Sequence, residues 1–104
     1  APAARGVRAF PLDDRAVTWG GGSVAVIWST ATGAALLELW HGAGLAGARV
    51  FPGGDRVATY GGAHGCRIWC AASGEALISL RPSAGADGAD LFPDGGRVLT
   101  WGRE

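Results

Sequence analysis

Histidine, cysteine and aspartate are the side chains of this sequence that could bind a metal ion or transfer a proton. The two histidines, His41 and His64, both lie in glycine-containing segments that predict loops on one face of the fold. They could act as metal ligands or as a general base. His64 lies in a glycine-rich turn, where a solvated side chain is the ordinary arrangement, whereas a structural role explains His41 better than a metal site or a general base.

The two cysteines do not form a recognisable site. Cys66 and Cys70 lie four positions apart in a predicted strand, and a rise of about 3.3 Å per residue separates their Cα atoms by about 13 Å. A disulfide requires Cα atoms within about 7 Å. The spacing is not Cys-x-x-Cys and no second ligand pair follows, so we expect two free thiols and no zinc site.

The aspartates Asp13, Asp14 and Asp55 lie in predicted turns, beside Arg15 and Arg56. Two carboxylates can serve as acid and base when a cleft holds them about 5 to 10 Å apart, but aspartates recur in exposed turns because they favour turn geometry. No nucleophile elbow, phosphate-binding loop or Cys/His dyad is present. We therefore expect a protein that is not an enzyme, without a catalytic residue, metal or cofactor.

Composition excludes further classes. The chain has 104 residues, of which 48% are hydrophobic and 17% charged, as in globular proteins, and its net charge is zero, so nucleic acid and membrane surfaces are not expected partners. No segment is long and apolar enough to span a membrane, and the N-terminus does not resemble a signal peptide. The compartment is left open, with the cytoplasm favoured. Because methionine is absent, we expect a piece of a longer protein.

The sequence is an internal repeat of 41 residues, present two and a half times without gaps. A shift of 41 positions aligns Phe10-Pro11 with Phe51-Pro52 and Phe92-Pro93, and Thr18 with Thr59 and Thr100. Of the 63 overlapping positions 27 are identical, where composition alone would give about six. Each unit therefore repeats one supersecondary structure.

Short apolar segments separated by turn residues predict four strands in each complete unit. Gly or Pro interrupts nearly every ten-residue window, which excludes long helices. Ala34 to Leu39 has helical propensity, but its counterpart recurs in register and we expect a strand. Val24 to Trp28 is apolar on both faces and should be covered on both. The predicted strands are 5–10, 15–19, 24–28, 34–40, 45–51, 56–60, 66–69, 75–80, 86–92 and 97–101.

The repeat resembles the WD-repeat family of β-propellers along essentially the whole chain. The segment from Phe92 to Thr100 is similar to the family's Phe-Ser-Pro-Asp-Gly turn and second strand, and Arg67-Ile68-Trp69 is similar to the segment that ends in its Trp-Asp pair. The implied fold is all-β, a partial propeller of four-stranded antiparallel blades. One segment, 1–104, would comprise blade 1 at about 4–40, blade 2 at about 45–81 and a half blade at 86–102.

The resemblance also implies a buried structural hydrogen-bond network. His41, Thr59 and Trp69 match the family's His, Ser/Thr and Trp, but Gly22 and Ala63 replace its Asp. Ser29 and Cys70 replace the Asp that follows Trp, and Pro82 stands where a third His would be. A buried histidine without its partner would lose about 1 to 3 kcal/mol if nothing replaced the Asp. We expect atypical, softer blades.

The resemblance implies a non-catalytic scaffold for protein-protein interaction, with loops and blade edges contacting other proteins. Two and a half blades cannot close a ring of about four to eight, so further blades in cis or self-association are expected. The alternative is an enzymatic or ligand-binding propeller, kelch-like (compare Tyr60-Gly61-Gly62) or quinoprotein-like (compare Thr32-Gly33), with its site in blades not present here. Possible interaction residues are Trp19, Tyr60, Trp101, His64 and Arg67, although the three aromatic residues are favoured for packing between blades.

Overall fold

The computed structural model describes residues 6–20, 22–62, 65–80, 88–91 and 98–101, the last two ranges by their backbone. Ten β-strands lie in these ranges. They are β1 (Gly6–Ala9), β2 (Arg15–Trp19), β3 (Val24–Ser29), β4 (Ala35–Trp40), β5 (Gly47–Val50), β6 (Arg56–Tyr60), β7 (Cys66–Cys70), β8 (Ala76–Leu80), β9 (Gly88–Leu91) and β10 (Val98–Trp101).

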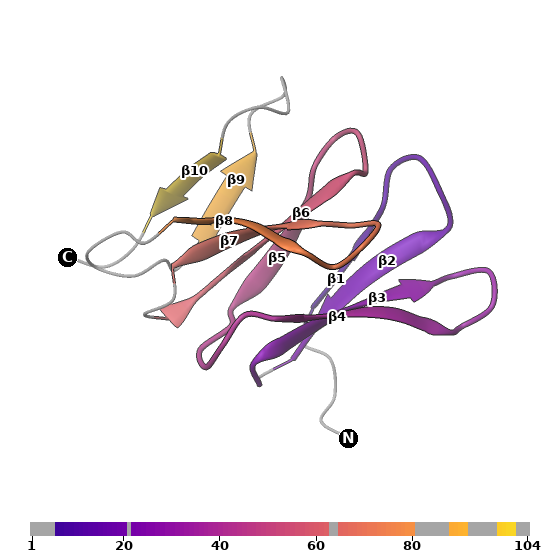
Figure 1. Cartoon of the computed structure of the whole chain (residues 1–104), viewed down its shortest axis with the longest axis horizontal. Coiled ribbons are helices and arrows are strands. Elements are labelled where there is room, and N and C mark those ends of the chain that lie inside the picture. The colour runs from indigo at the N-terminus through magenta and orange to yellow at the C-terminus, as the bar shows by residue number, and fades with distance from the viewer. Residues whose placement is uncertain (1–5, 21, 63–64, 81–87, 92–97, 102–104) are drawn as a thin grey trace.

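The strands form three antiparallel sheets in chain order. The first sheet is β1-β2-β3-β4, the second is β5-β6-β7-β8, and the third is the pair β9-β10. The sheets follow one another across the molecule, and β4 and β8 are the last strands of their sheets (Figure 1). The expected fold class, a partial propeller of four-stranded antiparallel blades, is confirmed.

Strand boundaries follow the predicted ones within one or two residues. The segment with helical propensity is β4, because its residues pair with β3 across the sheet. The strand expected from Leu45 begins instead at Gly47. Gly44 lies against the backbone of Gly61, and the chain joins the sheet only where Ala46 N–H donates to Tyr60 O at 2.8 Å.

The turn after the third strand of each complete sheet has the same backbone geometry in both sheets. Gly33 and Gly74 have φ angles of 79° and 80°, a region that residues with a Cβ rarely adopt. Their N–H groups donate to the carbonyls of Ser29 and Cys70, both at 2.8 Å. The recurring glycine of the sequence repeat therefore sets the direction in which the last strand returns along the sheet.

The core lies between the first and second sheets. Alternate residues of the first sheet, among them Val17, Ile27 and Leu39, are fully buried. They form one cluster with residues of the second sheet that include Val57 and Trp69. We call the face of the second sheet that bears Val57, Thr59 and Trp69 the covered face, because the first sheet packs on it.

The opposite face of the first sheet has no neighbouring sheet among the described residues. By the 41-residue register its residues Ala16, Thr18 and Trp28 correspond to Val57, Thr59 and Trp69, and we call it the open face. The expectation that β3 is covered on both faces is therefore wrong for this chain. Ala25 and Ile27 are buried, but the alternate residues Val24, Val26 and Trp28 are only half-buried.

The described residues contain no helix with the length and apolarity needed to cross a bilayer.

Candidate functional site

The structure brings His41, Thr59 and Trp69 together in one buried chain of hydrogen bonds. His41 lies in the loop between β4 and β5, Thr59 in β6 and Trp69 in β7, so the chain joins the connection between two sheets to the middle of the second sheet. Trp69 Nε1–H donates to Thr59 Oγ1 at 2.9 Å, and His41 Nδ1 lies 2.8 Å from the same oxygen. His41 and Thr59 are fully buried.

The geometry assigns a direction to each bond. A carbonyl only accepts, so His41 Nε2–H donates to Gly61 O at 3.0 Å. In the neutral ring Nδ1 is then an acceptor, and it receives the hydroxyl proton of Thr59, which in turn accepts from Trp69. With a neutral ring, each of these three polar side chains thus has a defined role in one network.

The Gly61 carbonyl gives His41 a hydrogen-bond partner, although the aspartate that the family resemblance implied as its partner is absent from the sequence. Gly61 has a φ of 140°, and a Cβ at this position would overlap Gly44 O and the backbone of Leu45 and Ala46. The absence of a side chain lets the two loops meet and places this carbonyl on His41. The softening expected from a missing partner therefore does not follow for the second sheet, because a backbone acceptor satisfies the ring.

Arg15 joins the first sheet to two turns of the second. Its guanidinium donates to Ala71 O at 3.1 Å and to Gly54 O at 3.0 Å. The carboxylate of Asp13 accepts from Arg15 Nη2 at 2.7 Å, and the guanidinium stacks 4.2 Å from the centroid of Phe10. The signal available in the sequence was the recurrence of this arginine as Arg56, 41 residues further on.

The Asp13 carboxylate is engaged in this contact. Its hydrogen bond from Arg15 holds the pKa of Asp13 below the usual 3.8, with a further contribution from the positive charge of the guanidinium. A carboxylate with a low pKa is a poor proton donor at neutral pH. Its position fits a structural counter-ion better than a general acid.

The two cysteines are free thiols in different surroundings. Cys66 is fully buried, and burial raises the pKa of its thiol to about 11. Cys70 is half-buried, and hydrogen bonds from the Ser73 side chain and backbone lower the pKa of its thiol below 9.0. No three His, Cys, Asp or Glu side chains of the described ranges are grouped so that they would hold a metal ion.

The recurring aromatic residues Trp19 and Tyr60 lie over glycines. Trp19 pairs with Gly6 and Tyr60 with Gly47 in the antiparallel registers, and a Cβ on either glycine would overlap the ring beside it. Both rings also pack against the core clusters. The rings therefore fill the space that a missing side chain leaves on a neighbouring strand, an arrangement known to stabilise strand glycines.

The remaining predicted interaction residues are placed as follows. Arg67 lies in β7, and its Nη1 donates to Trp40 O at 3.2 Å. This hydrogen bond joins the second sheet to the first. The Nε of Arg67 is buried and has no hydrogen-bond partner among the residues that the structure describes. His64 and the side chain of Trp101 lie outside the described residues.

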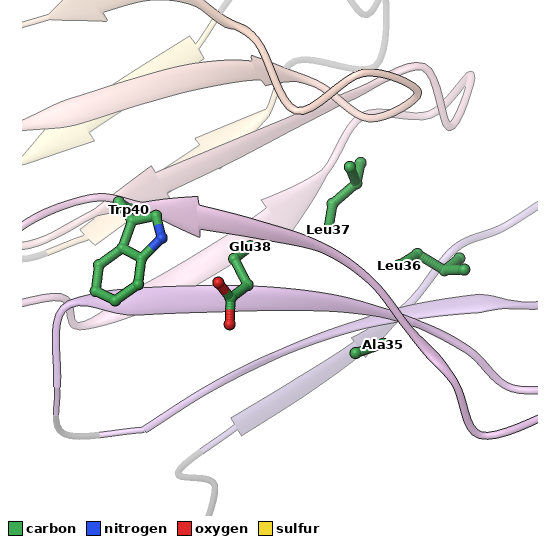
Figure 2. A pocket seen from close by; sticks show the side chains of 5 residues that line it. All are labelled: Ala35, Leu36, Leu37, Glu38 and Trp40. Atoms are coloured by element: carbon green, nitrogen blue, oxygen red, sulfur yellow. The ribbon is translucent and has the colours of Figure 1, made fainter.

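The outer strands present apolar side chains that sequence analysis did not select. Leu36 in β4 and its repeat counterpart Leu77 in β8 are each 48% exposed, and Trp40 is 60% exposed. An open pocket of about 460 Å³ is lined by Ala35, Leu36, Leu37, Glu38 and Trp40. Figure 2 shows Glu38 and Trp40 on the side of β4 opposite to Leu37. The available signal was the identity of Leu36 and Leu77 in the repeat.

No family model and no curated protein matches the chain. Among solved structures 79 chains match it. One is the β-propeller domain of Cps50 (Swd1) from Myceliophteria thermophila, with a TM-score of 0.80 at 19% sequence identity over 89% of this chain and 29% of that chain. The protein thus spans less than a third of the neighbour's length and has the fold of part of a β-propeller.

Proposed function

We propose that this chain is a non-catalytic interaction module, part of a longer propeller, whose outer strands bind other proteins. The observation that carries the proposal is the apolar exposure of β4 and β8. Leu77 stays 48% exposed although the first sheet packs on the second. The exposure of Leu77 is therefore a property of the outer strand and does not result from the absence of a covering sheet. Leu36 occupies the same position of the repeat, so we assign its exposure to the outer strand as well.

The polar groups that would otherwise suggest chemistry are held in structural contacts. His41 is buried and bonded to Thr59 and Gly61, and Asp13 is paired with Arg15. Large side chains exposed on a rigid strand are, in contrast, the kind that anchors protein interfaces. These observations support binding over catalysis.

Binding by the outer strands is tested with the full chain as bait in an extract of its source cells, with quantitative mass spectrometry of the captured proteins. The Leu36→Ser/Leu77→Ser variant should lose a defined subset of proteins. A matched Ser79→Ala variant, altered on the same exposed strand, should retain them. Equal capture by all three chains would contradict a role for the outer strands.

The alternative, a ligand-binding propeller, has a separate test. Titration of the chain with divalent metals and a panel of small ligands should leave its melting temperature unchanged. Reproducible tight binding that is abolished by His41→Ala or Asp13→Asn, in a variant whose circular dichroism shows that it remains folded, would overturn the scaffold proposal, because those side chains would then serve a ligand.

A further inference from the structure

Strand β4 has one free edge among the described residues, and the backbone groups on that edge can be identified. β4 is the last strand of the first sheet, and its register with β3 is regular from Leu37 to Trp40. Directly after β4, His41 N–H donates to Ser23 O at 2.9 Å, on the side of β3. Because backbone groups alternate in direction along a strand, those of Trp40 and Glu38 point to the free edge. The N–H and C=O of Glu38 are therefore available to a further strand.

The open pocket on β4 follows this free edge. It is lined by residues of β4 and by no residue of β3. Its lining side chains come from both sides of the strand, Leu37 from one side and Glu38 and Trp40 from the other (Figure 2). A hollow that contacts both sides of one strand lies along the edge of that strand. β4 also contains none of the lysines or prolines that commonly blunt a sheet edge.

One side of β4 carries an acidic group between two exposed apolar groups. Leu36, Glu38 and Trp40 occupy alternate positions, and Leu36 is 48% and Trp40 60% exposed. Glu38 is exposed as well, and within the described ranges its carboxylate has no ion pair or hydrogen bond. A carboxylate and the face of an indole both attract positive charge. The side chains at this edge are therefore complementary to a cation flanked by apolar groups.

We propose that the free edge of β4 binds an extended peptide of a partner protein by antiparallel strand addition, with an arginine or lysine of the peptide directly opposite Glu38. The peptide residue that exchanges both backbone hydrogen bonds with Glu38 has its side chain on the same side of the sheet. Its cationic group then meets the carboxylate and the Trp40 indole. Peptide residues two positions away on either side lie against Leu36 and Trp40, so the partner segment has the pattern apolar-x-basic-x-apolar.

This edge remains accessible when another sheet packs beside it. Leu77 and Ser79 of β8 correspond to Leu36 and Glu38 in the 41-residue register, and both stay exposed although the first sheet packs on the second. β8 has the same apolar exposure but a neutral Ser79 in place of the acid. The basic peptide should therefore select β4 over β8.

The inference rests on the proposed function, because it names the chemistry of the partner that the same outer strand would bind. The probe is a fluorescein-labelled, amidated peptide of sequence Thr-Leu-Thr-Arg-Thr-Leu-Thr, titrated with the 104-residue chain and followed by fluorescence anisotropy. Two sibling peptides carry citrulline, a neutral isostere, or glutamate at the centre. The arginine peptide should bind about fivefold tighter than the citrulline peptide, and the glutamate peptide should bind weakest.

Two changes separate the charge contact from strand pairing. Glu38→Gln should reduce the preference for arginine over citrulline to within about twofold, whereas Glu75→Gln, at another exposed glutamate, should retain the full preference. N-methylation of the central peptide amide removes the donor to Glu38 O and should weaken binding by about tenfold. In hydrogen exchange followed by NMR, the Glu38 amide should slow when the arginine peptide binds.

Several outcomes would overturn the proposal. They are no saturable binding at millimolar peptide, equal binding of the three peptides, and an undiminished preference for arginine in Glu38→Gln. Binding of the N-methylated peptide as tightly as its parent would exclude strand addition. Dimers detected by light scattering that protect the Glu38 amide without peptide would assign the edge to a second copy of the chain.

The capture experiment distinguishes failure of this inference from failure of the proposed function. Proteins lost from Leu36→Ser/Leu77→Ser but retained by Glu38→Gln would support binding by the outer strands and overturn the assignment of a basic peptide. Equal capture by all chains, including Leu36→Ser/Leu77→Ser, would overturn the proposed function itself.

Discussion

Replacement of Thr59 by valine removes one hydroxyl from the centre of the buried network while conserving side-chain shape. The hydroxyl serves two groups, His41 Nδ1 at 2.8 Å and Trp69 Nε1–H at 2.9 Å, and Thr59 and His41 are fully buried. A buried polar group left without a partner costs about 1 to 3 kcal/mol. Thr59→Val should therefore lower the free energy of unfolding by about 2 to 5 kcal/mol.

The repeat provides a matched control in the same molecule. Thr18→Val makes the same chemical change at the equivalent position of the first sheet, where the hydroxyl accepts only from Trp28 among the described residues and both side chains are half-buried. Water can reach the indole N–H there, so the loss should be about 1 kcal/mol or less. The difference between the two variants measures the combined effect of the histidine and of the deeper burial of the Thr59-Trp69 bond.

The assay is urea denaturation of both variants and the original chain, followed by far-ultraviolet circular dichroism at one temperature. Comparable slopes of free energy against urea concentration would show that the same unfolding is measured. A Thr59→Val chain as stable as the Thr18→Val chain would refute the reasoning. It would mean that His41 and Trp69 find other partners at no cost.

Three further predictions concern charges and thiols. Arg15→Met should destabilise by about 2 kcal/mol through loss of the bonds to Ala71 O and Gly54 O, with exposed Arg8→Met as the control in the same denaturation assay. The pKa of Asp13 is lowered below 3.8 in the folded chain, so its carboxylate contributes stability above that pH, and this contribution is lost as pH falls through the folded pKa. When the free energy of unfolding is measured from pH 6 to pH 2.5, it should therefore fall less steeply below pH 4 in Asp13→Asn than in the original chain. Iodoacetamide at pH 8 should modify Cys70 more than about 100-fold faster than Cys66, whose pKa is about 11, and Cys70→Ser should retain only the slow reaction.

The strands were predictable because their signal is local and occurs more than once. Glycines such as Gly33 and Gly74, with nearly equal φ angles, recur at the same register and bound apolar segments of similar length. The segment at β4 shows the value of the repeat, because its helical propensity alone would have favoured the wrong element. Recurrence in register placed it correctly, and pairing with β3 fixed it as a strand.

The environment of each face was not predictable in the same way. Thr18 and Thr59 occupy the same position of the 41-residue repeat, yet one is half-buried and the other fully buried. The difference comes from which sheet lies beside each, a property of the assembly that no local pattern records. The prediction that Val24 to Trp28 is covered on both faces failed for this reason.

The partner of His41 shows a second limit, which comes from the backbone. A comparison of side-chain types identifies Ala63 as the loss of a carboxylate and predicts a less stable blade. The structure instead supplies Gly61 O, a group that every residue has and that only conformation can direct. A Cβ at Gly61 would overlap the backbone of the opposing loop. The carbonyl can therefore take over the role of the missing carboxylate only because residue 61 is a glycine. A network can therefore retain its geometry while its side-chain signature disappears, which is consistent with a fold that matches a propeller at 19% identity.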